Sequence, residues 1–316
     1  MNCHLRTLIY SISVMFMVAG CTKQEDKLAK EEAKIDKSSG FISVDGAELR
    51  YVMEGKGTPL IAIGSSHYLP RSFSQGLRQH FKLICVDPRW YAPTNTLEDI
   101  TKITMDMLID DIEQVRRTLG FDKIAVLGHS ANGLWALEYA RQYPEHATHV
   151  IMHGTPPYVG EKVREESAEY WESHASDERK EIYKQKREEF EAIRSRLSPS
   201  EANIMDYVKN GPKMWYDPNY DCSWLWEGVQ IKVDILRHFF DVILHDYDFT
   251  HGDQIKTPVF LAIGKYDYIC PYYLWDDIKD KLPNLSYNLF EKSGHWPMLD
   301  EQELFDKKLI EWISNQ

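Results

Sequence analysis

The chain has few cysteines and no excess of positive charge. Its five cysteines among 316 residues are too few for a disulfide scaffold, and none stands in a Cys-x-x-Cys or Cys/His spacing that binds zinc. The 37 basic and 49 acidic side chains give a net charge of −12, which repels the phosphates of nucleic acids. We therefore expect no metal, no cofactor and no nucleic-acid partner. Because 43% of the residues are hydrophobic, one large folded body is expected instead of a disordered tail.

The first residues have the pattern of an export signal. An apolar run from Thr7 to Gly20 follows Arg6 and is too short to span a bilayer. Its end, Met17-Val-Ala-Gly-Cys21, resembles the lipobox of bacterial lipoproteins, in which a signal peptide is cut before a cysteine that then carries a lipid. The resemblance implies a signal peptide over residues 1–20, a lipid on Cys21 and a protein anchored to a membrane of the cell envelope. An ordinary cleaved signal that happens to precede a cysteine is the alternative.

Residues 21–40 are rich in Lys, Glu, Asp and Gln, which is the composition of a solvated tether. Beyond them, three cysteines remain in the folded body. Cys85 lies in an apolar run and is predicted to be a buried hydrophobic residue. Cys222 and Cys270 could pair in an oxidising compartment, although their spacing does not argue for it.

Both ends of the folded body alternate between predicted strands and helices. An Asp45-Gly46 turn between two alternating segments predicts a β-hairpin over residues 41–54. Near-continuous apolar runs predict strands buried on both faces, at residues 59–63, 82–86, 123–127, 148–152, 257–263 and 285–290. Helices are predicted at residues 105–119, 271–281 and 301–313. Residues 41–154 and 250–316 are therefore expected to form an α/β core, with a mostly parallel sheet of about eight strands flanked by helices.

The middle of the chain, residues 155–249, does not alternate and is predicted to be an inserted helical cap. Residues 161–200 carry 11 acidic and 9 basic side chains, interspersed as on a solvated helix face. Residues 205–250 carry ten aromatic side chains. These rings could form the small core of the insertion or line a pocket, and the sequence leaves both open.

One serine stands where catalytic serines are found. The segment Ile124-Ala-Val-Leu-Gly-His-Ser130-Ala-Asn-Gly133 is a buried strand, a tight turn and the start of a helix. A serine on such a turn projects its hydroxyl into the crevice at the strand ends, and the N–H of Ala131 can face an oxyanion. A serine hydroxyl is a poor nucleophile without a base, so a histidine and an acid must follow later in the chain.

Two later loops supply candidates for the base and the acid. His295 follows the last predicted strand, and Asp267 follows the strand before it. The order Ser130, Asp267, His295 is that of a serine-hydrolase triad on an open α/β sheet. The other acids near a strand boundary are Asp241, Asp246, Asp248 and Asp253, and the histidines expected to be structural are His67, His129, His153, His238, His245 and His251.

The motifs around these three residues resemble those of the α/β-hydrolase superfamily. They are Gly128-His-Ser-Ala-Asn-Gly133, Gly264-Lys-Tyr-Asp267 and Ser293-Gly-His-Trp-Pro-Met-Leu299, and the likeness covers nearly all of residues 41–316. The segment Ala140-Arg-Gln-Tyr-Pro-Glu145, after the helix that follows Ser130, and the helical cap also resemble proline-iminopeptidase-type enzymes and related ester or carbon–carbon bond hydrolases. The resemblance implies that Ser130 is the nucleophile, His295 the base and then the acid, and Asp267 the residue that orients the imidazole.

Three departures from the family pattern affect the expected site. The turn that carries the serine is called the elbow, and Asn132 stands where the family usually has its second glycine. Asn tolerates unusual backbone angles better than most residues. The segment Ile63-Gly-Ser-Ser66 lacks the usual His-Gly, so the second oxyanion N–H is expected from Ser65, with the hydroxyl of Ser65 or Ser66 as a further donor. Bulky rings replace glycines in Asp87-Pro-Arg-Trp-Tyr-Ala-Pro93, which changes the mouth of the pocket.

These observations lead to a serine hydrolase that cleaves an ester or amide bond of a small substrate through an acyl-enzyme. An aminopeptidase of proline-iminopeptidase type would need an acid for the substrate ammonium, and Glu165, Glu166, Glu169 and Glu172 of the cap are the candidates. A carboxylesterase or lactonase with the same triad is the alternative within enzymes. An inactive surface-binding protein is the alternative from another class. Epoxide and haloalkane hydrolases are disfavoured, because they use an aspartate nucleophile where this chain has Ser130.

Overall fold

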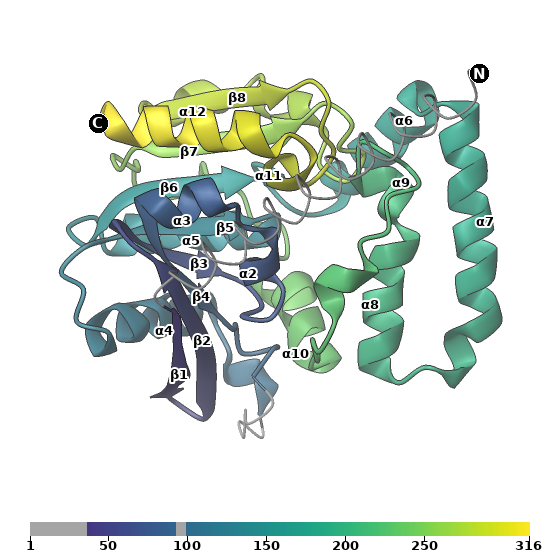
Figure 1. Ribbon diagram of the computed structural model, residues 1–316. Helices are drawn as coiled ribbons and strands as arrows, with labels where there is room; N and C mark the ends of the chain where they lie inside the picture. Colours follow the sequence, from purple (N-terminus) through teal and green to yellow (C-terminus); the bar gives the residue numbers. More distant parts are fainter. Residues whose placement is uncertain (1–36, 93–98) are drawn as a thin grey trace, which may run out of the picture. The chain divides into compact units, whose positions relative to one another are not determined.

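The apolar runs of the sequence form the strands of one eight-stranded sheet (Figure 1). The strands are β1 (Lys37–Val44), β2 (Ala47–Gly55), β3 (Thr58–Ile63), β4 (Phe81–Val86), β5 (Ile124–His129), β6 (Ala147–His153), β7 (Val259–Gly264) and β8 (Leu285–Phe290). Their order is β1-β2-β4-β3-β5-β6-β7-β8. Strand β2 runs antiparallel to β4, and every pair from β4 to β8 is parallel. The mostly parallel sheet predicted from the sequence is thereby confirmed.

The computed structural model describes residues 37–92 and 99–316. The predicted signal peptide, Cys21 and the predicted tether up to residue 36 lie outside the described residues. Residues 37–40, which were expected to end the tether, belong to β1. The Asp45-Gly46 turn joins β1 and β2 as expected, with Gly46 at a φ of 68° that glycine adopts readily.

Helices connect and cover the strands. They are α2 (Leu69–Ser72), α3 (Gln75–His80), α4 (Met105–Thr118), α5 (Ala131–Gln142), α6 (Glu161–His174), α7 (Asp177–Ile193), α8 (Pro199–Lys209), α9 (Gly211–Met214), α10 (Val233–His238), α11 (Pro297–Asp300) and α12 (Gln302–Ser314). A π-helix, η4 (Phe239–Ile243), continues α10. The 3.6-residue stripe of α4 buries Leu108, Ile112 and Val115, as its periodicity predicts.

The helix predicted at residues 271–281 is wrong. The segment forms two separate 3-10 turns, η5 (Tyr272–Trp275) and η6 (Lys279–Lys281), and its backbone bonds span three residues, as in Ile278 N–H to Trp275 O (3.1 Å). The fully buried Trp275 donates its indole N–H to the backbone carbonyl of Thr155 at 2.9 Å. We attribute the difference to this tertiary anchoring, which overrides a weak local preference for helix.

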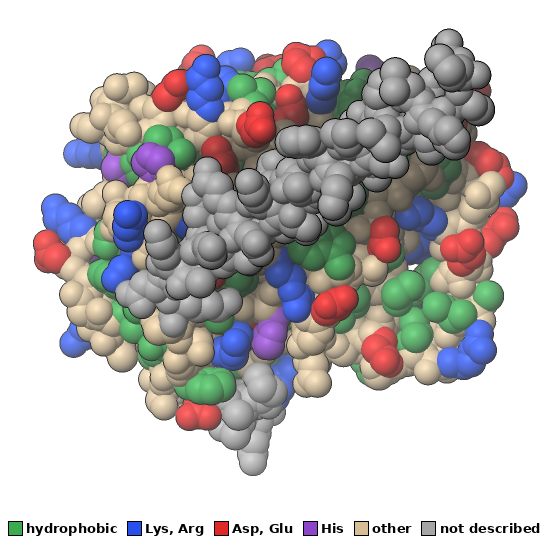
Figure 2. All heavy atoms as spheres, in the orientation of Figure 1, with side chains coloured by type: hydrophobic (Ala, Val, Ile, Leu, Met, Phe, Trp, Pro, Cys, Tyr) green, Lys and Arg blue, Asp and Glu red, His purple; other side chains and the backbone are tan. Residues whose placement is uncertain are grey.

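Helices α6 to α10 all lie between β6 and β7 in the chain, within residues 155–249. In Figure 1, α6 to α9 stand together beside the sheet, with α7 and α8 packed against each other. Most charged side chains of α6 and α7 are exposed, and Figure 2 shows acidic and basic groups interspersed on this face. That arrangement is typical of a solvated surface.

The described residues contain no disulfide and no membrane-spanning helix. Cys85, Cys222 and Cys270 are all buried free thiols, so the pairing of Cys222 with Cys270 that the sequence left open is not formed. Within residues 37–92 and 99–316, no helix has both the length and the apolar character needed to cross a bilayer.

Candidate active site

Ser130 sits at the turn between β5 and α5 in a backbone conformation that side-chain-bearing residues rarely adopt. Its φ is 54° and its ψ is −133°. Two hydrogen bonds hold this turn: the Ser130 N–H donates to His153 O at 3.0 Å, and the Gly133 N–H donates to Ser130 O at 2.9 Å. Backbone strain of this kind persists where the surrounding structure enforces it, and it is common at catalytic residues.

The two glycines beside the serine let strand and helix approach closely. A Cβ at Gly128 would lie 2.1 Å from Asn132 O, and a Cβ at Gly133 would lie 2.1 Å from Thr155 Oγ1. Asn132 has ordinary helical geometry inside α5, so the expectation that its tolerance of unusual angles preserves the turn is not needed. Its amide donates instead to Ile63 O at 3.2 Å, which ties the elbow to the end of β3.

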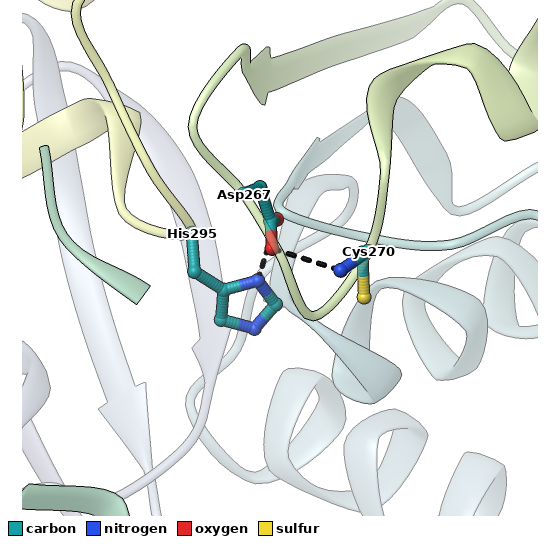
Figure 3. A group of neighbouring side chains, drawn as sticks. All are labelled: Asp267, Cys270 and His295. Carbon is teal, nitrogen blue, oxygen red and sulfur yellow. Dashed lines mark hydrogen bonds and ion pairs between the residues drawn. The ribbon is translucent and has the colours of Figure 1, made fainter. Parts of the chain in front are cut away.

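His295 and Asp267 form a buried pair at the ends of β8 and β7 (Figure 3). The His295 Nδ1 lies 2.7 Å from Asp267 Oδ2, and the two residues are 2% and 0% exposed. The other carboxylate oxygen, Oδ1, accepts the N–H groups of Ile269 (2.9 Å) and Cys270 (2.8 Å). These bonds fix the carboxylate. Within residues 37–92 and 99–316, the His295 Nε2 has no hydrogen-bond partner, so this nitrogen is available for proton transfer.

The cluster of Asp267, Cys270 and His295 has the residue types of a metal site (Figure 3). Asp267, Cys270 and His295 bring possible ligand atoms within 4.8 Å of one another. Both carboxylate oxygens are already used, however, and Cys270 presents its backbone nitrogen to Asp267 (Figure 3). Burial raises the pKa of the Cys270 thiol well above its usual value, so the thiolate that a metal would need is disfavoured. The chemistry of this donor set is that of a carboxylate–imidazole pair.

Ser130 and His295 line one cavity of about 330 Å³, together with Ser65 and Ala131. Its walls are largely aromatic and apolar. They include Tyr68, Trp90, Tyr91, Tyr207, Trp226, Phe239, Phe240 and Trp296. Four of these rings come from the aromatic-rich part of the helical segment, whereas Trp215 and Phe249 of the same stretch are buried in the core. Four of the aromatics thus line a pocket, which is one of the two roles that the sequence left open, whereas Trp215 and Phe249 pack in the main hydrophobic core and not in a separate core of the insertion. Trp90 and Tyr91 are the bulky rings that stand in place of glycines.

Ala131 and Ser65 are placed to offer N–H groups to the cavity. Ala131 is the first residue of α5, so its N–H has no intrahelical acceptor. Neither N–H donates to another residue of the described chain. The Ser65 hydroxyl oxygen accepts from the N–H groups of His67 (3.2 Å) and Tyr68 (3.3 Å). Ser66 does not line the cavity: its N–H donates to Asp87 and its hydroxyl accepts from Arg50.

Comparison with known proteins identifies the family. A family model described as "alpha/beta hydrolase fold" matches residues 60–302. The chain belongs to the α/β-hydrolase superfamily. The AB hydrolase superfamily protein YclE of Bacillus subtilis is 31% identical over 277 residues, covering 87% of this chain and 98% of that protein. A proline iminopeptidase of Clostridioides difficile is 24% identical over 227 residues, covering 66% of this chain and 72% of that enzyme.

Solved structures agree on the fold of this α/β hydrolase. An α/β-fold hydrolase from Bacillus anthracis superposes with a TM-score of 0.64 at 21% identity, covering 86% of this chain and 97% of that one. An epoxide hydrolase from Bacillus megaterium gives a TM-score of 0.62 at 17% identity, with 87% and 100% covered. At such identities the likeness shows the fold alone. This protein is a hydrolase of that superfamily.

The acids proposed from the sequence to bind an ammonium do not reach the cavity of this hydrolase. Glu165, Glu169 and Glu172 are exposed on α6, and Glu166 accepts a hydrogen bond from Tyr273 at 3.1 Å. Among the described residues, the acid that lines the cavity is Asp206 on α8, which the sequence reasoning missed. Its carboxylate is bonded to Lys209 Nζ at 2.6 Å and to the Asn210 amide at 3.1 Å.

Two histidines near His295 were expected to be structural, and they pack on the loop that carries His295. The His129 ring stacks on Trp296 with centroids 3.5 Å apart, and its Nε2 lies 3.0 Å from His295 O. The fully buried His153 lies 4.6 Å from His129, ring to ring. Burial lowers the pKa of His153 to about 3, so it stays neutral at physiological pH. The position of His129 directly before Ser130, at the end of a buried strand, was the available sequence signal for its place beside the site.

Proposed function

We propose that this α/β hydrolase is a serine hydrolase that cleaves the carboxylic ester of a small, largely apolar substrate. The observation that carries the proposal is a strained Ser130 sharing an aromatic cavity of about 330 Å³ with His295, whose Nδ1 is paired with the buried Asp267. A volume of this order accommodates a compact acyl group and excludes a folded polypeptide.

The proposed reaction assigns one role to each group. Ser130 Oγ attacks the ester carbonyl while His295 Nε2 takes its proton, and the N–H groups of Ala131 and Ser65 stabilise the oxyanion. His295 then returns the proton to the departing alcohol, which leaves an acyl-enzyme on Ser130. Water, deprotonated by His295, releases the carboxylic acid and restores the serine. Asp267 orients the imidazole through its bond to Nδ1 and stabilises the imidazolium that forms.

The charges at the cavity favour an ester over an aminoacyl substrate. Recognition of a free N-terminal ammonium requires an acid that faces the substrate and has no other cationic partner. Asp206 is the acid among the described residues that line the cavity, and Lys209 Nζ lies 2.6 Å from its carboxylate. This ion pair already neutralises the carboxylate, so an ammonium would have to displace Lys209. The remaining walls are mostly rings suited to apolar groups.

An aminopeptidase of the proline-iminopeptidase type is the second candidate. The relative from Clostridioides difficile carries that name, and Asp206 gives the cavity an acid that substrate binding could recruit. One panel of substrates distinguishes the esterase from the aminopeptidase. It contains p-nitrophenyl esters of short acyl chains, and naphthylamides of proline and other amino acids. We expect turnover of the esters and little or none of the naphthylamides. Efficient cleavage of the naphthylamides would select the aminopeptidase.

The nucleophile is tested with the same substrates. We expect Ser130→Ala to lower kcat by about 10⁴-fold or more, as removal of a triad member does in serine proteases. A fluorophosphonate probe should add its mass to the peptide that contains Ser130. Ser173→Ala, a change at an exposed serine of α6, is the matched control and should behave as wild type. A protein that turns over neither substrate class and resists the probe while folded would instead be a binding protein with a hydrolase fold.

We also propose that the hydrolase is exported and held at a membrane of the cell envelope through a lipid on Cys21. The support is the sequence Met17-Val-Ala-Gly-Cys21 that ends the apolar segment. In cells fed a clickable palmitate analogue, the wild type should be labelled and should sediment with membranes. Cys21→Ala should lose both properties. Unlabelled wild-type protein would argue for an ordinary cleaved signal.

A further inference from the structure

A buried arginine of the helical segment has no described carboxylate as a partner. Arg179 lies in the first turn of α7 and is 6% exposed. Its guanidinium donates to three backbone carbonyls, those of Pro212 (2.7 Å), Trp215 (2.8 Å) and Tyr216 (2.5 Å). It makes no ion pair with any residue in the described part of the chain. Burying a cation costs free energy of folding unless its hydrogen bonds are well satisfied. The position of Arg179 therefore needs a physical explanation.

Two tyrosine rings from the loop that carries Asp267, called the acid loop here, also contact the Arg179 guanidinium. Its Cζ lies 5.6 Å from the ring centroid of Tyr266 and 5.5 Å from that of Tyr268. These residues stand on either side of Asp267 in the chain. Arg179 therefore contacts the acid loop through cation–π interactions and the 212–216 segment through hydrogen bonds.

The 212–216 segment turns its other carbonyls toward the catalytic loops. Lys213 O accepts the N–H of Tyr268 at 3.0 Å, and Met214 O accepts the N–H of His295 at 2.6 Å. All five carbonyls of the segment are thus engaged, three by Arg179 and two by the loops that carry the acid and the base. Figure 1 places α9, which contains Met214, between α7 and the end of the sheet that carries α11.

Two further contacts lock the segment to the histidine loop. Asp300 Oδ2 accepts both the Gly294 N–H (2.8 Å) and the Tyr216 N–H (3.2 Å). A Cβ at Gly294 would lie 2.2 Å from Met214 O, so the two backbones touch directly at this point. A shift of the segment by a fraction of an ångström must therefore move the backbone of His295.

We propose that Arg179 is a positioning residue for catalysis, which holds the 212–216 segment so that its carbonyls fix the loops of Asp267 and His295. The assignment rests on the proposed triad and extends it to a side chain of the helical segment that touches no reacting atom. Loss of Arg179 leaves three carbonyls without this donor, two of them on the buried Pro212 and Trp215, and loosens the support of both catalytic loops. Misplacement of a catalytic group by about 1 Å can cost on the order of 10²-fold in rate.

The test compares Arg179→Met with Arg187→Met in the full-length protein. Arg187 lies on the same helix and is exposed, so it controls for the removal of a charge from α7. Active sites are counted by the burst of p-nitrophenol, and kcat is expressed per active site. We expect Arg179→Met to lower this kcat by about 10- to 100-fold with a much smaller change in KM, whereas Arg187→Met stays within about twofold of wild type.

A purely structural role would reduce the number of active sites and leave the kcat of each site unchanged. Arg179→Ala supplies a second readout, because millimolar methylguanidinium can enter the space left by the side chain and donate to the same carbonyls. Recovery of kcat with methylguanidinium and not with methylammonium supports the proposal. A per-site kcat in Arg179→Met equal to that of Arg187→Met overturns it. Activity retained by Ser130→Ala would instead overturn the triad on which it rests.

Discussion

Gly133 provides a quantitative test of how the elbow is built. The family usually has a glycine at the position of Asn132. In this chain the glycine comes one residue later, and Gly133 packs closely against Thr155. A Cβ at Gly133 would lie 2.1 Å from Thr155 Oγ1, 2.8 Å from its Cγ2 and 2.9 Å from its Cβ. Thr155 is fully buried and lies two residues beyond the end of β6, so it has little room to move.

The expected destabilisation of Gly133→Ala can be worked from these contacts. Overpacking a rigid core site costs about 1–3 kcal/mol, and three contacts below 3.0 Å place this site near 3 kcal/mol. The greater helix propensity of alanine offsets about 1 kcal/mol. We therefore expect a net loss of about 2 kcal/mol in the free energy of unfolding, with lower ester turnover because Ser130 shares the turn.

Thr155→Ala removes the two closest atoms and should relieve most of the overlap. Alone it deletes one buried methyl group and a hydroxyl whose bond to His153 O is long, at 3.4 Å, so its cost is about 1 kcal/mol. In the double variant we expect a coupling energy of about 2 kcal/mol in favour of recovery. Urea denaturation followed by circular dichroism measures all four proteins.

The control is Gly211→Ala on α9, where the nearest atom to a new Cβ is 3.6 Å away. Its stability should change by less than about 1 kcal/mol. Additive effects of Gly133→Ala and Thr155→Ala, to within about 0.5 kcal/mol, would refute the reasoning. They would show that the helix shifts away from Thr155 and that the close contact is not required.

Two further predictions concern Ser130 and Asp87. Ser130→Gly should be more stable than Ser130→Ala by about 1–2 kcal/mol in urea denaturation, because only glycine relaxes at a φ of 54°; equal stabilities would show that the turn is unstrained. Burial raises the pKa of Asp87 from 3.8 to about 6, so its stabilising contribution is complete below pH 4 and is lost as the pH rises through 6. Asp87→Asn should therefore flatten the fall in stability between pH 4 and 7 by about 3 kcal/mol, and an unchanged slope would contradict the shift.

The parts of the fold that the sequence predicted are those whose cause is local. Strands β3 to β7 are largely buried on both faces, so most of their residues are apolar and form near-continuous runs that few other structures would require. The turn at Ser130 was predictable because a strand, a small-residue turn and a helix follow within ten residues. The 271–281 segment was not, because the anchor of Trp275 is the carbonyl of Thr155, which lies 120 residues earlier.

The candidate site also contains residues that could be predicted from the sequence and residues that could not. His295 and Asp267 were found from their positions after consecutive strands, and the structure brings them to 2.7 Å. Asp206 was missed because nothing in its helix distinguishes the face that meets the cavity. Arg179 was missed for a deeper reason: its partners are backbone carbonyls, which leave no complementary side chain in the sequence. The glutamates of α6 were chosen for their charge and the resemblance to proline iminopeptidases; Glu165, Glu169 and Glu172 are exposed, and Glu166 is hydrogen-bonded to Tyr273.

In the 212–216 segment, the main chain supports the catalytic loops, whereas a side chain helps to form the cavity wall. Met214 holds His295 through its carbonyl oxygen while its side chain forms part of the cavity wall. A carbonyl is present whatever residue occupies the position, so Met214 can be exchanged for a smaller or a more polar residue without removing the bond that fixes the base. In an evolving lineage, the range of accepted acyl groups could thus drift at this position while the geometry of proton transfer stays constant.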